Sequence, residues 1–135
     1  MILSNEKKSK LERGMQTRRK VLGNTHVDKT IQEKDSFDED FQRFITESVW
    51  GTVWSRKSSL NLRDRSLITL AVLATSGHEK EFEMHIRATL NTSTSKEDVK
   101  EMLLHIASYV GVPVSNQFIK IAKKSKIEVP FLRPK

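Results

Sequence analysis

Apolar residues recur three and four positions apart along most of the chain, a spacing typical of amphipathic helices rather than strands. The pattern predicts a charged helix over residues 4–22, which Gly23-Asn24 ends. Residues 24–35 are predicted to be a polar connection. The first quarter of the chain is therefore expected to hold one helix and a loop.

A second helix is predicted to begin at a capping box. The Ser36 hydroxyl and the Glu39 carboxylate have the spacing at which each can satisfy a free backbone N–H of the first turn. Trp50 and Trp54, one turn apart, come near the end of this helix. The apolar residues at helical spacing along it are Phe37, Phe41, Phe44, Ile45 and Val49.

The most apolar run of the chain lies within residues 62–76 and predicts a buried helix. Gly77 suits the left-handed position that follows such a helix. A further helix is predicted over residues 79–90. Its apolar residues, four positions apart, are Phe82, Ile86 and Leu90.

Two more helices are predicted in the last third of the chain. Ser95 and Asp98 resemble a capping box, and Gly111 ends the helix that follows. Pro113 suits the first turn of a last helix, which cannot continue past Pro130. The apolar stripe of the earlier helix comprises Val99, Met102, Leu103, Ile106, Ala107 and Val110. The pattern predicts an all-α, compact single-domain helical bundle of about six helices.

Composition supports one domain over residues 1–135, with 36% hydrophobic and 30% charged residues. The formal net charge is +7, and residues 1–34 hold nine Lys/Arg against four Asp/Glu. The basic excess thus lies in the N-terminal helix and connection, ahead of a helical core over about residues 36–125. Such a segment is typical of a nucleic-acid binder, of an enzyme that attracts a small polyanion, or of an ordinary solvated helix.

Absent residues and motifs narrow the chemistry. The sequence contains no cysteine, so disulfides, thiolate metal sites and cysteine nucleophiles are excluded. No apolar run approaches the roughly 20 residues of a membrane-spanning helix, and no signal peptide is recognisable. Glycine-rich phosphate loops are missing too. We therefore expect a cytoplasmic protein with no nucleotide cofactor and no membrane partner.

Histidine is the usual group for proton transfer near neutral pH. His78, Glu81 and His85 are spaced to share one face of the helix predicted over residues 79–90, where the carboxylate can orient an imidazole. An ordinary charged helix face explains the same residues. A metal site is disfavoured because the spacing is not that of two histidines one turn apart.

Other candidate residues lie in the first half of the chain. Arg18 and Arg19 form a basic edge, and arginine binds carboxylates and phosphates equally well. His26 lies in the polar connection, where a histidine is usually just exposed. Trp50 and Trp54 have the spacing of core or interface residues more often than of ligand contacts.

Several segments resemble the carboxymuconolactone decarboxylase family, namely residues 65–71, 81–88 and 109–113. Residues 18–23 and 50–56, together with Gly14-Met15 and His26-Val27-Asp28, are similar to the branch that decarboxylates 4-carboxymuconolactone. The resemblance extends from about residue 12 to 124 and rests on the order and spacing of these pieces.

The chain departs from the redox members of this family. Their C-x2-C-x3-H motif corresponds here to His78, Glu81 and His85, so both thiols are missing and only the histidine is retained. Ser66 stands where the redox proteins carry a glutamate. Relatives usually have Asn-Gly after this helix, whereas the chain has Asn91-Thr92, and Asn91 is expected to adopt the left-handed conformation.

The resemblance implies cofactor-independent decarboxylation of 4-carboxymuconolactone to the β-ketoadipate enol-lactone. It also implies a homo-oligomer built from dimers, up to a hexamer, whose partner is a small anionic lactone rather than nucleic acid. Three alternatives remain: a family member that acts on another substrate, a non-catalytic or redox member, and a basic nucleic-acid-binding module.

Site roles follow from the tasks of that reaction. His85 is the expected proton donor, and Glu81 orients it. His26 is a candidate donor to the lactone oxygen, and His78 a further substrate contact. The candidate carboxylate clamps are Arg18, Arg19 and Arg65, and the candidate apolar wall is Trp50 with Trp54.

Overall fold

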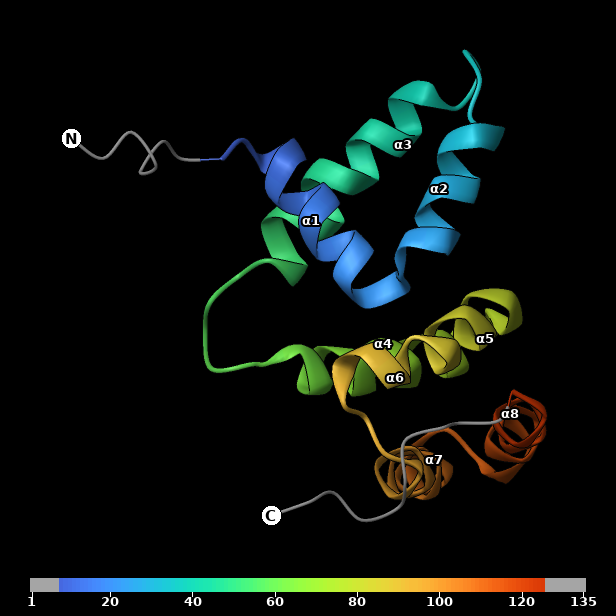
Figure 1. The fold of residues 1–135 in the computed structure, drawn as a ribbon. Coiled ribbons are helices and arrows are strands. Elements are labelled where there is room, and N and C mark those ends of the chain that lie inside the picture. The colour runs from blue at the N-terminus through green and yellow to red at the C-terminus, as the bar shows by residue number, and fades with distance from the viewer. Residues whose placement is uncertain (1–7, 126–135) are drawn as a thin grey trace. The chain divides into compact units, whose positions relative to one another are not determined.

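A computed structural model of the chain describes residues 8–125, and these residues are almost entirely helical (Figure 1). The all-α prediction is confirmed, although the described residues form more helices than the six expected. The elements in chain order are α1 (Lys10–Leu22), α2 (Asn24–Glu33), α3 (Glu39–Ile45), the π-helix η2 (Thr46–Trp54), α4 (Leu62–Thr75), α5 (Glu79–Arg87), α6 (Thr89–Thr92), α7 (Lys96–Tyr109) and α8 (Val112–Lys124).

The helices divide into two compact units, Met1–Ser58 and Ser59–Lys135, and each is described by itself below. The first unit contains α1, α2, α3 and η2, and the second contains α4 to α8. None of the described helices is long and apolar enough to cross a membrane. The start of the first helix at residue 4 stays a prediction, because residues 1–7 lie outside the described range. The single domain stays a prediction as well.

In the first unit, α1 begins with a capping box in which the Ser9 hydroxyl accepts a hydrogen bond from the Glu12 backbone N–H. Two glycines then allow α1 and η2 to pack backbone against backbone. A Cβ atom on Gly14 would overlap the Thr46 carbonyl oxygen, and one on Gly51 would overlap the Lys10 carbonyl oxygen. Glycine is therefore required at both positions for this close approach.

The predicted polar connection over residues 24–35 is wrong, because α2 occupies most of it. Gly23 adopts a φ of 90°, which lets the chain turn directly from α1 into α2. Val27 is the one buried residue of α2, so the sequence lacks the apolar stripe that announces a surface helix. His26 consequently lies on a helix and not in a loop.

The predicted capping box at Ser36 is also wrong. The helix α3 begins at Glu39 behind Asp38, which makes no side-chain capping bond. The turn before it is held instead by two aspartates: Asp38 accepts from the Asp35 N–H at 2.9 Å, and Asp35 accepts from the Phe37 N–H at 2.9 Å. Aspartate commonly stabilises such turns by bonding to nearby backbone.

The apolar residues at helical spacing along this segment do not form a buried face. Phe37 is 95% exposed, and Phe41, Phe44 and Val49 are exposed as well. After Ile45 the backbone changes to π-helical hydrogen bonding, whose wider turns shift the residues that face inward. The buried residues of η2 are Thr46, Trp50, Gly51 and Trp54.

The second unit has a core between α4, α5, α7 and α8. Phe82 of α5 meets Phe118 of α8 edge to face, with ring centroids 4.8 Å apart. Such a contact stabilises a core beyond the area that it buries. The buried residues around this pair are Leu70, Ala74, Ile86, Val99, Leu103, Ile106 and Ala122.

Most predicted helix boundaries in the second unit are confirmed. Gly77 has a φ of 76° directly after α4, Ser95 and Asp98 form a capping box, and Pro113 lies in the first turn of α8. The arginine Arg63 of α4 also reaches that box, donating to Asp98 from Nη2 at 2.6 Å and from Nε at 2.9 Å. This ion pair fastens the start of α4 to the start of α7.

Three expectations for this unit are wrong. The helix over residues 79–90 ends at Arg87, so Leu90 falls in the short helix α6 and is exposed. The helix α4 is not buried all round, since Val72 is 56% exposed. Ser93, not Asn91, adopts the left-handed conformation, with a φ of 58°. The expected end of the last helix at Pro130 lies outside the described residues.

Candidate active site

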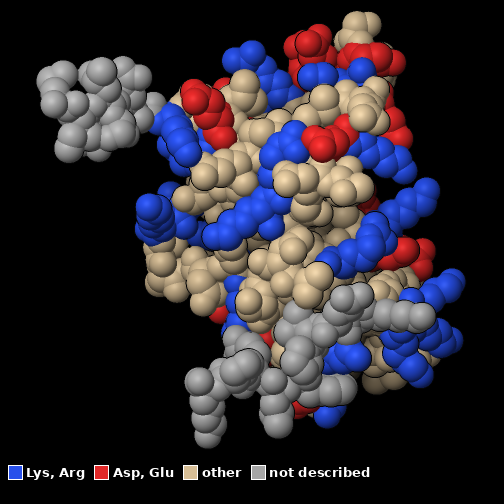
Figure 2. Space-filling model, in the orientation of Figure 1, with Lys and Arg blue, Asp and Glu red and all other residues tan. Residues whose placement is uncertain are grey.

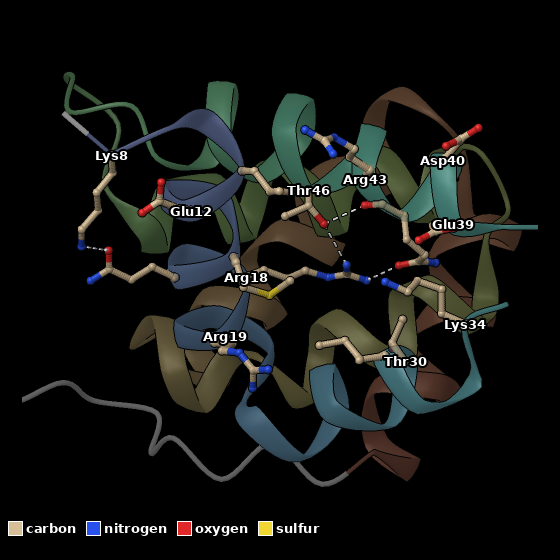
Figure 3. Close-up of a pocket in the computed structure, with 15 residues that line it drawn as sticks. Lys8, Glu12, Arg18, Arg19, Thr30, Lys34, Glu39, Asp40, Arg43 and Thr46 are labelled. Carbon is tan, nitrogen blue, oxygen red and sulfur yellow. Dashed lines mark hydrogen bonds between the residues drawn. The ribbon is translucent and has the colours of Figure 1, made fainter. Parts of the chain in front are cut away.

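The first unit contains a cavity of about 680 Å³. Residues from α1, α2, α3 and the start of η2 line it, and Arg18 extends across its centre (Figure 3). Arg19, Lys34, Gln42 and Thr46 are among its other lining residues. Two of the three arginines predicted as carboxylate clamps therefore line one cavity, and Arg65 does not.

Arg18 is a buried cation held by neutral groups. Its side chain is largely shielded from solvent, with the residue only 6% exposed. Nη1 donates to the Thr46 hydroxyl oxygen at 3.1 Å, and Nη2 donates to the Gln42 side-chain oxygen at 3.1 Å. Within the described residues no carboxylate forms an ion pair with Arg18. Burial lowers the pKa of the guanidinium, which nevertheless stays charged at neutral pH.

Three neighbouring cations of the cavity are already engaged. Arg19 pairs with Asp28 at 2.8 Å and also donates to Asn24 at 3.1 Å. Arg43 pairs with Glu47 at 3.1 Å, and Lys8 donates to Gln16 at 2.6 Å. Arg18 differs from them because it is both buried and held only by uncharged acceptors.

This difference indicates what the cavity can bind. Taking a charge out of water is expensive unless an opposite charge compensates it. The Arg18 guanidinium uses two N–H groups on Thr46 and Gln42, and its Nε–H has no partner among the described residues. A carboxylate in the cavity would supply the missing negative charge through short, charge-assisted hydrogen bonds.

The face of the first unit seen in Figure 2 adds to this electrostatic picture. Lys and Arg side chains are scattered over it, and acidic side chains gather at the turn between α2 and α3. The acidic residues at this turn are Glu33, Asp35, Asp38, Glu39 and Asp40. The basic excess of the N-terminal segment is thus balanced locally by the acidic turn that follows it.

In the second unit, the histidine frame lies at α5. His85 is 6% exposed and lies in the last turn of α5 beside the core residues Phe82 and Ile86. Glu81, one turn earlier, is exposed, and His78 is exposed at the N-terminal cap. Arg65 is half-buried on α4. Of the predicted acid–base residues, the structure therefore shields only His85 from water.

The remaining predicted residues do not line the cavity of the first unit. His26 is half-buried in the first turn of α2. Trp50 and Trp54 are both buried, with ring centroids 5.0 Å apart. The tryptophan pair therefore belongs to the interior of the unit.

Gln42 and Thr46 are functional candidates that the sequence reasoning missed. They are four residues apart, so they lie one turn apart across the junction of α3 and η2. Neutral polar residues at this spacing carry no motif, and a helix surface explains them equally well. Only the position of the Arg18 guanidinium between them marks them out.

Comparison with known proteins gives the chain its relatives. Residues 39–124 match the carboxymuconolactone decarboxylase family. The chain belongs to this family. The 4-carboxymuconolactone decarboxylase of Acinetobacter baylyi is 41% identical over 113 residues, which cover 84% of each chain. The nitrosuccinic acid decarboxylase of Metarhizium robertsii is 31% identical over 114 residues, which cover 84% of this chain and 79% of that protein.

Membership of the carboxymuconolactone decarboxylase family places the candidate residues in context. Gln42, Thr46 and His85 lie within the matched segment, whereas Arg18 and Arg19 precede it. The chain lacks cysteine, so the thiol–disulfide chemistry of a peroxide-reducing family member is excluded. Among the described residues, no cluster of three or more His, Asp or Glu side chains is arranged to hold a metal ion.

Proposed function

We propose that the chain decarboxylates 4-carboxymuconolactone to the β-ketoadipate enol-lactone without a cofactor. The observation that carries the proposal is the buried Arg18 guanidinium, which lines a cavity and has no acidic partner among the described residues. The 41% identical relative named as a decarboxylase of this lactone supports the choice of substrate.

The reaction sets three tasks for the protein. The bond between the ring carbon and its carboxylate breaks, and CO₂ leaves. The released electron pair moves through the ring double bond onto the lactone carbonyl and gives a dienolate, which then takes up a proton on carbon. The protein must therefore hold a dianion, stabilise charge on the lactone oxygen and deliver one proton.

The chemistry decides which carboxylate Arg18 should hold. A guanidinium paired with the departing carboxylate would stabilise the substrate more than the transition state, and so would slow the reaction. We therefore assign Arg18 to the carboxymethyl carboxylate, which stays on the product. Arg19 is assigned a weaker role, because it already pairs with Asp28. Arg65 stays a further candidate clamp.

His85 is assigned as the proton donor, because it is buried and retains the histidine of the family frame. Glu81 would tune its charge from the preceding turn, and His78 is a candidate contact at the start of the same helix. His26 stays the candidate donor to the lactone oxygen. The proposed role of Trp50 and Trp54 is to exclude water from the interior of the first unit, since both are buried there.

The decisive experiment is an assay of the purified protein with 4-carboxymuconolactone. We expect loss of the lactone absorbance together with release of one CO₂ per lactone. An Arg18→Met variant purified in the same way distinguishes turnover by this chain from turnover by a contaminant. The proposal fails if the lactone, supplied below KM, is consumed at the buffer rate or at equal rates by both proteins.

A second substrate follows from the 31% identical relative named as a nitrosuccinic acid decarboxylase. Nitrosuccinate is also a dianion, and loss of one carboxylate leaves a stabilised nitronate that needs a proton on carbon. The same buried cation and proton donor suit this chemistry. Comparing kcat/KM for the two substrates decides between them.

We further propose that the chain assembles as a homo-oligomer built from dimers, up to a hexamer, in the cytoplasm. Support for assembly comes from the exposed aromatic residues of the first unit, Phe37, Phe41 and Phe44. Isolated subunits rarely leave such side chains together in water.

A further inference from the structure

We infer that Gln42 and Thr46 are positioning residues that hold the Arg18 guanidinium without neutralising it, so that its charge is available to a carboxylate of the ligand. The inference rests on the proposed function only in taking that ligand to be the substrate. Nothing about the histidines of the second unit enters it.

The hydrogen bonds around Thr46 give the first step. The Thr46 hydroxyl donates its single hydrogen to the backbone carbonyl oxygen of Gln42 at 2.7 Å. The oxygen therefore presents only lone pairs to Nη1 of Arg18, at 3.1 Å. A hydroxyl fixed in this way acts as an acceptor for the guanidinium and cannot turn its hydrogen toward it.

The second step concerns Gln42. Its side-chain oxygen accepts from Nη2 of Arg18 at 3.1 Å, on the neighbouring nitrogen of the same plane (Figure 3). Two acceptors on two nitrogens fix both the position and the rotation of the guanidinium. Neither acceptor carries a charge, so the cation is oriented without an ion-pair partner among the described residues.

The third step concerns rigidity. Thr46 is 2% exposed, and its backbone carbonyl lies against Gly14 of α1, where no Cβ atom would fit. The threonine therefore cannot move toward α1, and the guanidinium that it orients is fixed before the ligand arrives. Such preorganisation reduces the entropic cost of binding.

The fourth step is the choice of a neutral residue at position 42. Glutamate would have the same shape and would form an internal ion pair with Arg18. The acidic residues Glu39 and Asp40 line the same cavity, yet neither forms an ion pair with Arg18. Glutamine at position 42 thus leaves the positive charge for an external carboxylate.

The test compares Gln42→Glu with the matched variant Gln16→Glu. Gln16 also lines the cavity, but it accepts from Lys8 instead of Arg18. Both variants add one negative charge to the same cavity. Succinate is the probe, and its binding to each full-length protein is measured by calorimetry together with the melting temperature.

We expect Gln42→Glu to weaken succinate binding by about tenfold or more and to raise the melting temperature, because the buried cation gains a counterion. Gln16→Glu should change the dissociation constant by less than about threefold, since Gln16 is exposed and its added charge would pair with Lys8. If succinate binding weakens equally in both variants, the added negative charge alone explains the effect, and the inference is overturned. Absence of saturable succinate binding by the unaltered protein would overturn it too.

Thr46 gives a second test through kinetics. Thr46→Val keeps the shape and removes the acceptor, so KM for the lactone should rise by about tenfold while kcat changes little. Thr46→Ser keeps the hydroxyl and should restore KM. A fall in kcat with an unchanged KM would contradict a positioning role. If succinate binding behaves as expected but the lactone is not turned over, the inference stands and the proposed function fails.

Discussion

Arg18 and Arg19 are adjacent arginines with different partners. One is buried between two neutral acceptors, and the other is half-buried and paired with Asp28. Their sequence positions alone give no reason to separate them. The structure therefore turns a predicted basic edge into one principal anion contact and one supporting residue, with different expected consequences on substitution.

Replacing each arginine by methionine should separate these roles. Arg18→Met should raise KM by roughly tenfold to a hundredfold, the range for loss of hydrogen bonds to a charged group. It should also maintain or raise the melting temperature, because a buried cation is replaced by an apolar side chain. Arg19→Met should raise KM only a few-fold. The arrangement would be contradicted by kinetics in which Arg19→Met is the more damaging change.

His85 is the residue on which the proton transfer depends. A positioned proton donor contributes about 10²–10⁴-fold to a rate, so His85→Gln should lower kcat by about that factor. Glu81→Gln should have a smaller effect, since Glu81 is exposed while His85 is buried. Steady-state kinetics with circular dichroism as a folding control measures both. Full activity of His85→Gln would move the donor elsewhere, with His26 as the first residue to test.

At the scale of elements, the contact between α1 and η2 is set by two glycines. Gly14 and Gly51 each lie against a backbone carbonyl of the other helix. The Thr46 carbonyl oxygen lies against Gly14 in this contact, and the Thr46 hydroxyl accepts a hydrogen bond from Arg18. Helix packing and orientation of Arg18 therefore depend on the same few atoms.

Gly14→Ala should accordingly affect stability and binding together. The added methyl group meets backbone, which cannot rotate away, so the free energy of unfolding should fall by about 1–3 kcal/mol. KM should rise as well, because Thr46 must shift. Gly77→Ala is the control: it meets no atoms within 4 Å and carries only the cost of its positive φ. Urea unfolding with kinetics below the transition tests both, and an unchanged KM for Gly14→Ala would uncouple packing from the site.

The ion pair between Arg63 and Asp98 makes the second unit sensitive to acid. Hydrogen bonds from Arg63 lower the pKa of Asp98 from its usual 3.8 to about 2. Because the pKa is lower in the folded state, the stabilisation is complete above about pH 4 and is lost as the pH falls toward 2.

Asp98→Asn should therefore flatten the decline in stability over that acidic range, and at neutral pH it should cost about 2 kcal/mol. Glu83→Gln, which removes an exposed pair with Arg87, is the control and should change little. Urea midpoints measured at several pH values provide the comparison. Parallel pH profiles for the unaltered protein and Asp98→Asn would exclude this role for the pair.

At the scale of the whole molecule, the exposed side chains of Phe37, Phe41 and Phe44 favour contact with another subunit. We expect light scattering at micromolar concentration to give a mass several times 15.6 kDa. Replacing Phe41 and Phe44 by serine should lower that mass without loss of helicity. A monomeric mass for the unaltered protein would exclude the proposed assembly.

The sequence predicted the elements that a local signal marks. Gly77, Pro113 and the pair Ser95–Asp98 determine boundaries through their own backbone chemistry, and the structure has each of them as expected. The helix α2 was missed because it buries a single valine, and the cap of α3 was missed because aspartates compete with Ser36 for the same turn.

The candidate site was predictable only in part, for a related reason. Charged residues such as Arg18 are visible as candidates in the sequence, but their burial and pairing depend on contacts between distant segments. Thr46 lies 28 residues from Arg18 in the sequence. A threonine and an arginine that far apart give no sequence signal of a hydrogen bond between them. Partners of this kind become apparent only when the helices are placed in space.

The π-helical segment η2 makes the first unit sensitive to chain length as well as to residue type. Each of its hydrogen bonds spans one residue more than in an α-helix, so the segment accommodates the equivalent of an inserted residue. Deleting one residue between Glu47 and Val53 would let α-helical hydrogen bonding resume while the residues that follow keep their orientation, so Trp54 would stay in the interior. If the segment instead adopted α-helical hydrogen bonding with no residue deleted, the residues after it would turn by about 100° around the helix axis. Trp54 would then leave the interior although no apolar residue had been replaced, so the hydrogen-bonding pattern of η2, and not its composition alone, places this tryptophan inside.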